Sequence, residues 1–132
     1  MIVPSQPSIV WQPTLWLHTR FARNFVLQYE ADWLDTTGYA NVVLEFINYY
    51  GTAQTELAIE GCDTVDGGWT EVTSFDGVTQ GSSYVMLSTS RARSDEEYRL
   101  WRFLRWRWQG NGGSGALEPY DYCFKIRAMF KP

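Results

Sequence analysis

The sequence predicts an all-β protein: an antiparallel, jelly-roll-like β-sandwich of about seven to eight strands. Three observations predict this class. Short segments alternate apolar and polar residues, turn residues separate them roughly every 8–15 residues, and no helix-period segment is long enough for a βαβ unit. With 132 residues, of which 17% are aromatic, the chain can bury one core without disulfides. We expect an extended N-terminal arm over residues 1–14 and a single sandwich domain over residues 15–132.

The arm is predicted from its prolines, because three of them interrupt residues 1–14 and proline blocks both helices and central strands. Ile9, Val10 and Trp11 lie between these prolines, and a solvated linker would not need them. The arm therefore packs either along its own domain or on a neighbouring subunit, and the sequence leaves both open.

The first half of the domain begins with residues 15–21, which fit either a short strand or a turn. Residues 23–30 then alternate as a strand, and residues 35–38 form a turn cluster. Residues 41–50 are the longest strand candidate and have few polar gaps. A strand that is apolar on both sides is expected to be central in its sheet, or to be covered by a partner.

The middle of the chain is predicted to form two hairpins. Residues 55–62 and 69–75 are strands joined by a loop over residues 63–68, which is rich in Asp and Gly. After a second glycine-containing loop, residues 84–89 form the next strand.

The last third is predicted to hold two long strands. The polar residues 91–99 fit a helical turn, because Ser94 and Glu97 have the spacing of a capping box. Residues 101–108 alternate strictly, residues 110–115 form a flexible glycine-rich loop, and residues 122–130 close the sheet. In the strand at 101–108, one face comprises Leu104, Trp106 and Trp108, and the other Phe103, Arg105 and Arg107. We expect the first face to lie in the core.

Charge is distributed unevenly along the chain. Residues 1–90 carry two cations and ten acids, whereas residues 91–132 carry nine cations and five acids. Either the basic late strands pair with acidic early ones, such as the strand with Glu56 and Glu60, or they form a positive patch for an acidic partner. The net charge of −4 argues against a general nucleic-acid binder. A single-stranded nucleic-acid contact through Arg105, Arg107, Trp101 and Phe103 is the weaker option.

No catalytic, metal or cofactor site is predicted. His18 is the sole histidine, so a nucleophile–histidine arrangement has one candidate base, which lies in a predicted edge segment. Asp63 and Asp66 lie in a loop that lacks the regular ligand spacing of a calcium site, and the adjacent Glu96 and Glu97 diverge on any regular element. We therefore expect a protein that is not an enzyme.

Cysteine use and hydropathy bear on location. No secretory signal and no apolar stretch near the length of a membrane span is visible. Cys62 and Cys123 are expected to be free thiols in a reducing compartment, with a single bridge across the sandwich as the alternative.

Residues 56–75 resemble the central hairpin of discoidin-like β-sandwiches, in which a strand ends in a D-G-x-W-T turn and returns. Residues 102–108 are similar to a later strand of that family, and residues 123–130 would be its closing strand. Similar sandwiches also occur in the head and tail proteins of tailed phages. The resemblance implies a sandwich fold. Discoidin-type domains are usually secreted and bind glycans or lipid headgroups.

Together these observations predict a non-enzymatic structural subunit of a homo-oligomeric assembly, most simply a virion protein that decorates a capsid or associates with a tail. Its location would be a virion or an intracellular assembly. The alternative is a carbohydrate-binding module that stacks sugars on Trp69 and Trp101. The predicted interface residues are Ile9, Val10, Trp11, Trp101, Arg105 and Arg107.

Overall fold

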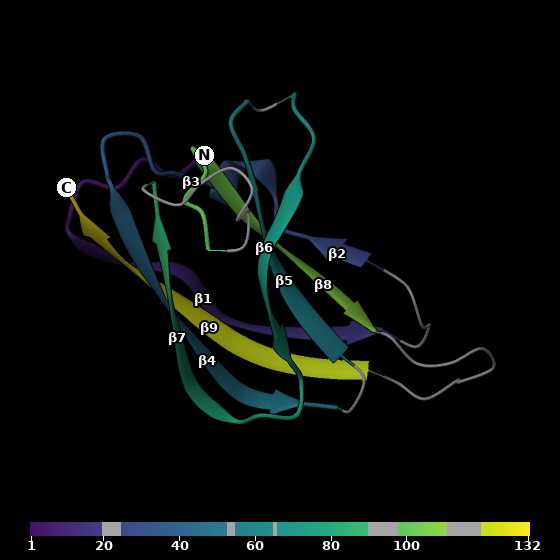
Figure 1. The fold of residues 1–132 in the computed structure, drawn as a ribbon. Coiled ribbons are helices and arrows are strands. Elements are labelled where there is room, and N and C mark those ends of the chain that lie inside the picture. Colours follow the sequence, from purple (N-terminus) through teal and green to yellow (C-terminus); the bar gives the residue numbers. More distant parts are fainter. Residues whose placement is uncertain (20–24, 53–54, 65, 90–97, 111–119) are drawn as a thin grey trace.

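A computed structural model describes the chain in six segments, residues 1–19, 25–52, 55–64, 66–89, 98–110 and 120–132. Within them the chain forms nine β-strands and one short 3-10 helix, arranged as two antiparallel sheets that make a sandwich (Figure 1). The predicted class is confirmed, with slightly more strands than expected. The helical turn predicted around Ser94 and Glu97, the carboxylate pair Glu96–Glu97 and most of the loop at 110–115 lie outside the described residues.

The first sheet has four strands in the order β1-β9-β4-β7, so β9 and β4 are central and β1 and β7 are its edges. Its strands are β1 (Ser8–Thr19), β4 (Asn41–Gly51), β7 (Gly81–Ser88) and β9 (Tyr120–Lys131). The apolar segment at 41–50 is therefore central, as predicted. Its residues nevertheless alternate between a buried inner face and a partly exposed outer face.

The second sheet has the strand order β2-β8-β5-β6, with β3 pairing β8 as a fifth strand. Its strands are β2 (Phe25–Leu27), β3 (Leu34–Asp35), β5 (Thr55–Cys62), β6 (Thr70–Asp76) and β8 (Phe103–Gly110). The 3-10 helix η1 (Glu30–Asp32) connects β2 to β3. Strand β8 begins at Phe103, so Trp101 precedes the strand in which the sequence placed it.

The core lies between the two sheets and is built largely from aromatic rings. On β8 the predicted inward face is confirmed, because Leu104, Trp106 and Trp108 are at most 3% exposed. The Trp106 ring meets Phe124 of β9 edge to face, with centroids 5.3 Å apart. Such edge-to-face pairs add stabilisation beyond the area that they bury.

The N-terminal segment contributes to the sandwich. Strand β1 begins at Ser8, inside the segment expected to be an arm, and pairs with β9 as far as Thr19. Trp11 is 1% exposed and belongs to the core cluster. The pairing register shifts between Gln12 and Leu15, around Pro13. An edge strand with a bulge tolerates proline because one side of its backbone needs no partner, which explains how a proline-rich segment forms a strand here.

Candidate functional site

The outer face of the four-stranded sheet is unusually apolar. Strand pairing places residues of all four strands on this face, and we call the following set the outer apolar face: Val10, Trp16, Val43, Ile47, Tyr50, Tyr84, Met86 and Met129. Five of its members are large side chains more than 40% exposed, and Val43, Ile47 and Met129 are half-buried. A concentration of exposed apolar side chains on one face of a domain commonly marks an interaction site.

Charged groups of both signs also lie on this face. Glu45 of β4 accepts a hydrogen bond of 2.6 Å from the Tyr84 hydroxyl, and this contact raises the pKa of Tyr84. The same carboxylate lies 3.7 Å from the guanidinium of Arg127 on β9. These contacts connect β7, β4 and β9 across the centre of the face.

One end of the face carries an exposed aromatic pair. Trp16 on β1 and Tyr50 on β4 both pair in register with Cys123, which lies between them on β9. Their ring centroids are 6.2 Å apart at 35°, and the side chains cover Cys123, which is only 2% exposed. Beside the pair, the His18 ring nitrogen Nδ1 lies 2.6 Å from the Asp121 carboxylate.

The predicted interface residues of the N-terminal segment separate onto different faces. Val10 is 45% exposed and belongs to the outer apolar face. Ile9 is partly buried against the core, and Trp11 is buried and donates its indole N–H to the Asp32 carbonyl at 2.8 Å. Trp11 therefore has a partner within its own chain, which is the intramolecular option that the sequence left open.

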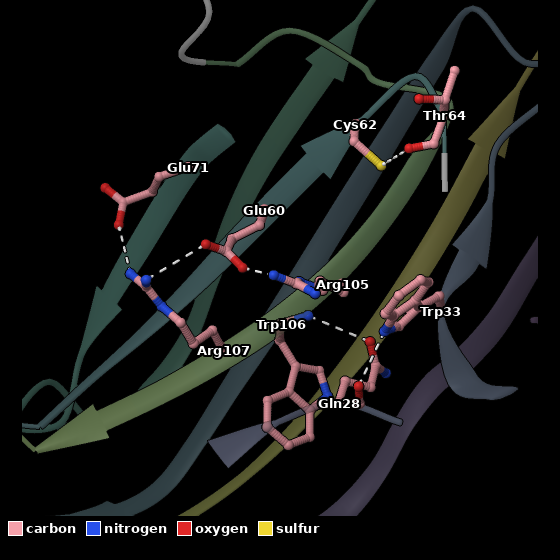
Figure 2. Close-up of polar contacts among 9 residues, drawn as sticks. All are labelled: Gln28, Trp33, Glu60, Cys62, Thr64, Glu71, Arg105, Trp106 and Arg107. Atoms are coloured by element: carbon pink, nitrogen blue, oxygen red, sulfur yellow. Dashed lines mark hydrogen bonds and ion pairs between the residues drawn. The ribbon is translucent and has the colours of Figure 1, made fainter. Parts of the chain in front are cut away.

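The predicted arginines lie on the opposite outer face, that of the second sheet, within an ion-pair cluster (Figure 2). Arg105 Nε donates to Glu60 at 3.0 Å, and Arg107 lies 3.6 Å from Glu60 and 3.8 Å from Glu71. This arrangement confirms the predicted pairing of basic late strands with the acidic strand at 55–62. Partial burial, followed by the neighbouring carboxylate of Glu56, raises the pKa of Glu71.

The Trp69 ring packs against this cluster. The Arg105 guanidinium lies 4.0 Å from the Trp69 ring centroid, a cation–π distance, and the Trp33 ring meets Trp69 edge to face at 4.8 Å. Phe103, on the same strand as Arg105, is 5% exposed. The role of Trp69 in stacking a sugar stays a prediction, but its ring already has contacts with these neighbours.

Trp101 lines a cleft of about 500 Å³ at one end of the sandwich, together with Thr36, Asp63, Arg99 and Arg102. Its ring lies so close to the backbone of β5 that a Cβ added at Gly61 would be 2.5 Å from it. The guanidinium of Arg99 lies 4.1 Å from the Trp101 ring centroid and also approaches Asp63 at 3.5 Å. A polar cleft is present, and Trp101 is part of its wall.

Chemistry-bearing residues are dispersed in the part of the chain that the structure describes. No group of three His, Cys, Asp or Glu side chains is placed there to hold a metal ion. Cys62 and Cys123 are buried, unbridged and in different sheets, and burial raises the pKa of each thiol. Among the same residues no helix has the length and apolar character needed to cross a membrane.

Sequence reasoning missed Trp16, Tyr50, Tyr84 and Met86, four of the five most exposed residues of the outer apolar face. A signal for two of them was available. Tyr84 and Met86 alternate with the inward residues of β7, so a period-two reading would have placed them outside. Trp16 and Tyr50 gave no such signal, because each follows a register shift in its strand.

Comparison with known proteins identifies no family. No family model matches the chain, and no curated protein sequence matches it. A solved structure described as "Bacillus endospore appendages form a novel family of disulfide-linked pili" is similar at a TM-score of 0.41 and 14% identity, covering 98% of this chain and 95% of that one. The module CBM27-1 of Caldicellulosiruptor saccharolyticus, solved with mannohexaose, is similar at a TM-score of 0.33 and 15% identity, covering 89% of this chain and 66% of that one. Both scores are low, so neither likeness supports an argument about function.

Proposed function

We propose that the chain is a non-enzymatic structural subunit that associates with further copies of itself through the outer apolar face. The observation that carries this proposal is the contrast between the two outer faces. One carries five exposed apolar side chains around the Glu45–Arg127 ion pair, whereas on the other the ion-pair cluster around Glu60 lies beside the exposed Phe25 ring. Aromatic residues and Met are enriched in protein interfaces, and a charged outer face is the ordinary solvated surface of a sandwich.

The dimensions of the face suit a second copy of the chain. Four strands about 4.8 Å apart, with eight paired residues of about 3.3 Å each, give a footprint of roughly 500 Å². A standard interface needs about 800 Å² of accessible surface per partner. Because side chains project from the sheet, the accessible area exceeds the footprint, and one face supplies most of such an interface.

Charge also favours a copy of the same chain. The face carries cations on β9, Lys125 and Arg127, and acids on β4 and β9, Glu45 and Asp121. A face that contains both signs can be matched by the same face of another copy, whereas a strongly basic or acidic partner would leave one sign unpaired. The predicted place in a virion, on a capsid or a tail, stays a prediction, and nothing in the fold favours it over another assembly.

Light scattering coupled to size exclusion tests the proposal. We expect the wild-type chain to form concentration-dependent oligomers and Met86→Lys to shift them to monomer, because Met86 is 49% exposed on the face. Val78→Lys is the matched control, since Val78 is 63% exposed but lies in the loop between β6 and β7. A monomeric wild type, or an oligomer that Met86→Lys leaves intact, would contradict the proposal.

A specific observation favours glycan binding as a second candidate function. Trp16 and Tyr50 present adjacent exposed rings, with the polar groups of His18 and Asp121 beside them. Sugars need an apolar ring surface together with hydrogen-bonding groups, and this end of the face offers both. A glycan array read with wild type, Trp16→Ala and Tyr84→Ala separates the candidates: glycan binding by a monomer that only Trp16→Ala removes would replace the assembly proposal.

A further inference from the structure

A second cavity, partly open to solvent, lies at the side of the sandwich where β1 and β2 form the edges of the two sheets. Its volume is about 310 Å³. Leu15 and Leu17 of β1 form one wall, and Val26 and Leu27 of β2 form the other, with the Trp106 ring among the lining residues. Leu15 and Leu17 alternate with Trp16 along β1 and therefore point to the opposite side of the strand. The cavity is thus separate from the outer apolar face.

The size of this cavity suits a small organic molecule. An engineered apolar cavity of about 150 Å³ in another protein stays dry and binds benzene. Roughly twice that volume accommodates a molecule with two fused rings or a short acyl chain. Ligand sites in proteins are typically concave, mainly apolar, and contain a few polar groups that fix the orientation of the ligand.

Gln28 supplies such a polar group. It lines the cavity, is only 4% exposed, and uses its Oε1 to accept the backbone N–H of Trp106 at 3.3 Å (Figure 2). This contact assigns the other amide atom as Nε2, which is buried and has no acceptor among the described residues. Buried donors are almost always paired, so Gln28 Nε2 is a donor that the oxygen of a molecule bound in the cavity can engage.

Charge around the cavity restricts the ligand further. The lining residues that the structure describes include one acid, Asp32, and no lysine or arginine. An anionic ligand would lose its hydration without gaining a cation, and it would be repelled by Asp32. Asp32 could pair with a cation, but a cationic group supplies no acceptor for the buried Gln28 amide. An uncharged molecule with an acceptor oxygen fits both observations.

We propose that this cavity binds a small neutral apolar molecule that carries a carbonyl or ether oxygen, with the Gln28 amide donating to that oxygen. The inference goes beyond the proposed assembly function and does not depend on it. The apolar walls supply the affinity, and the amide selects an acceptor-bearing ligand over a plain hydrocarbon.

Titration with prodan, a neutral naphthalene ketone dye, tests the site. We expect saturable binding with blue-shifted emission, and at least about tenfold weaker binding to Leu17→Trp, whose larger side chain fills the cavity. Val26→Phe is the second filling variant in case the first fails to fold. Val78→Trp is the control, because it adds an indole at an exposed position away from the cavity.

The role of Gln28 has its own readout. We expect Gln28→Met to weaken prodan binding while leaving the binding of dimethylaminonaphthalene, which lacks the carbonyl, unchanged. Unsaturable binding by the wild type, or wild-type affinity in filling variants shown to be folded by near-ultraviolet circular dichroism, would overturn the proposal. Loss of prodan binding in Met86→Lys would place the dye on the outer apolar face and would also overturn it, whatever the oligomeric state.

Discussion

Replacing Glu60 by glutamine tests how far the ion-pair cluster stabilises the second sheet. Glu60 is 5% exposed, and its carboxylate lies 3.0 Å from Arg105 and 3.6 Å from Arg107. The amide keeps the length of the side chain and one acceptor oxygen but removes the charge. Of the two guanidinium groups, with side chains 15% and 28% exposed, Arg107 would keep Glu71 at 3.8 Å and Arg105 would keep its contact with the Trp69 ring.

The expected loss follows from this burial. Removing one partner of a buried ion pair costs about 3–5 kcal/mol, because the other charge stays buried without compensation. Glutamine still accepts a hydrogen bond, and Arg105 keeps its contact with the Trp69 ring, so we expect the lower end, about 3 kcal/mol. For a chain of this size that corresponds to a fall in Tm of about 10 °C.

Urea unfolding followed by tryptophan fluorescence measures the change, at one protein concentration because assembly contributes to apparent stability. Asp63→Asn is the matched control. Asp63 pairs with Arg99 at 3.5 Å, but its side chain is 47% exposed, so its loss is expected to cost less than about 1 kcal/mol. If Glu60→Gln costs no more than Asp63→Asn, the buried carboxylate is not the counter-charge that the geometry indicates.

Three further outcomes are expected. Gly61→Ala should destabilise the fold by about 1–3 kcal/mol in urea unfolding, because the added Cβ meets the Trp101 ring; an unchanged midpoint would show that the ring moves aside at no cost. Partial burial and then nearby carboxylates raise the pKa of Glu71, so the ionised group opposes folding above that pKa; Glu71→Gln should therefore raise stability near neutral pH and lose this advantage in acid, and a lower stability at neutral pH would refute the sign. Burial raises the pKa of Cys62 and Cys123, so iodoacetamide should alkylate both slowly in the folded protein and quickly in urea, as mass spectrometry of timed samples would show; rapid native labelling of Cys123 would mean that its aromatic cover opens.

Local patterns predicted the strands that alternate without interruption. The core face of β8 and the pairing of its arginines with acids follow from period-two alternation and charge balance. The local patterns did not predict the start of β1 at Ser8, because prolines generally disfavour strands. The prolines of this segment are tolerated only because β1 is an edge strand with a register shift. Nor did the local patterns show that Trp69 and Trp101 pack on Arg105 and Gly61, because these contacts are with other strands.

The candidate site was less predictable than the fold. Whether an aromatic residue in a two-layer protein faces the other sheet or solvent depends on register, and a single bulge reverses the assignment. Trp16 and Tyr50 both follow such shifts, so their exposure became visible only in the paired sheet.

The strand order has a consequence for how the chain folds during synthesis. Strand β9 is the last of the described strands to leave the ribosome, yet it lies between β1, the first, and β4 (Figure 1). Until β9 emerges, β1 lacks its neighbour and β4 has only β7. The second sheet has the same kind of dependence one strand earlier, since its last strand, β8, lies between β2 and β5 but precedes β9. The sheet that carries the outer apolar face is thus completed last, which delays the surface proposed for self-association until both layers exist.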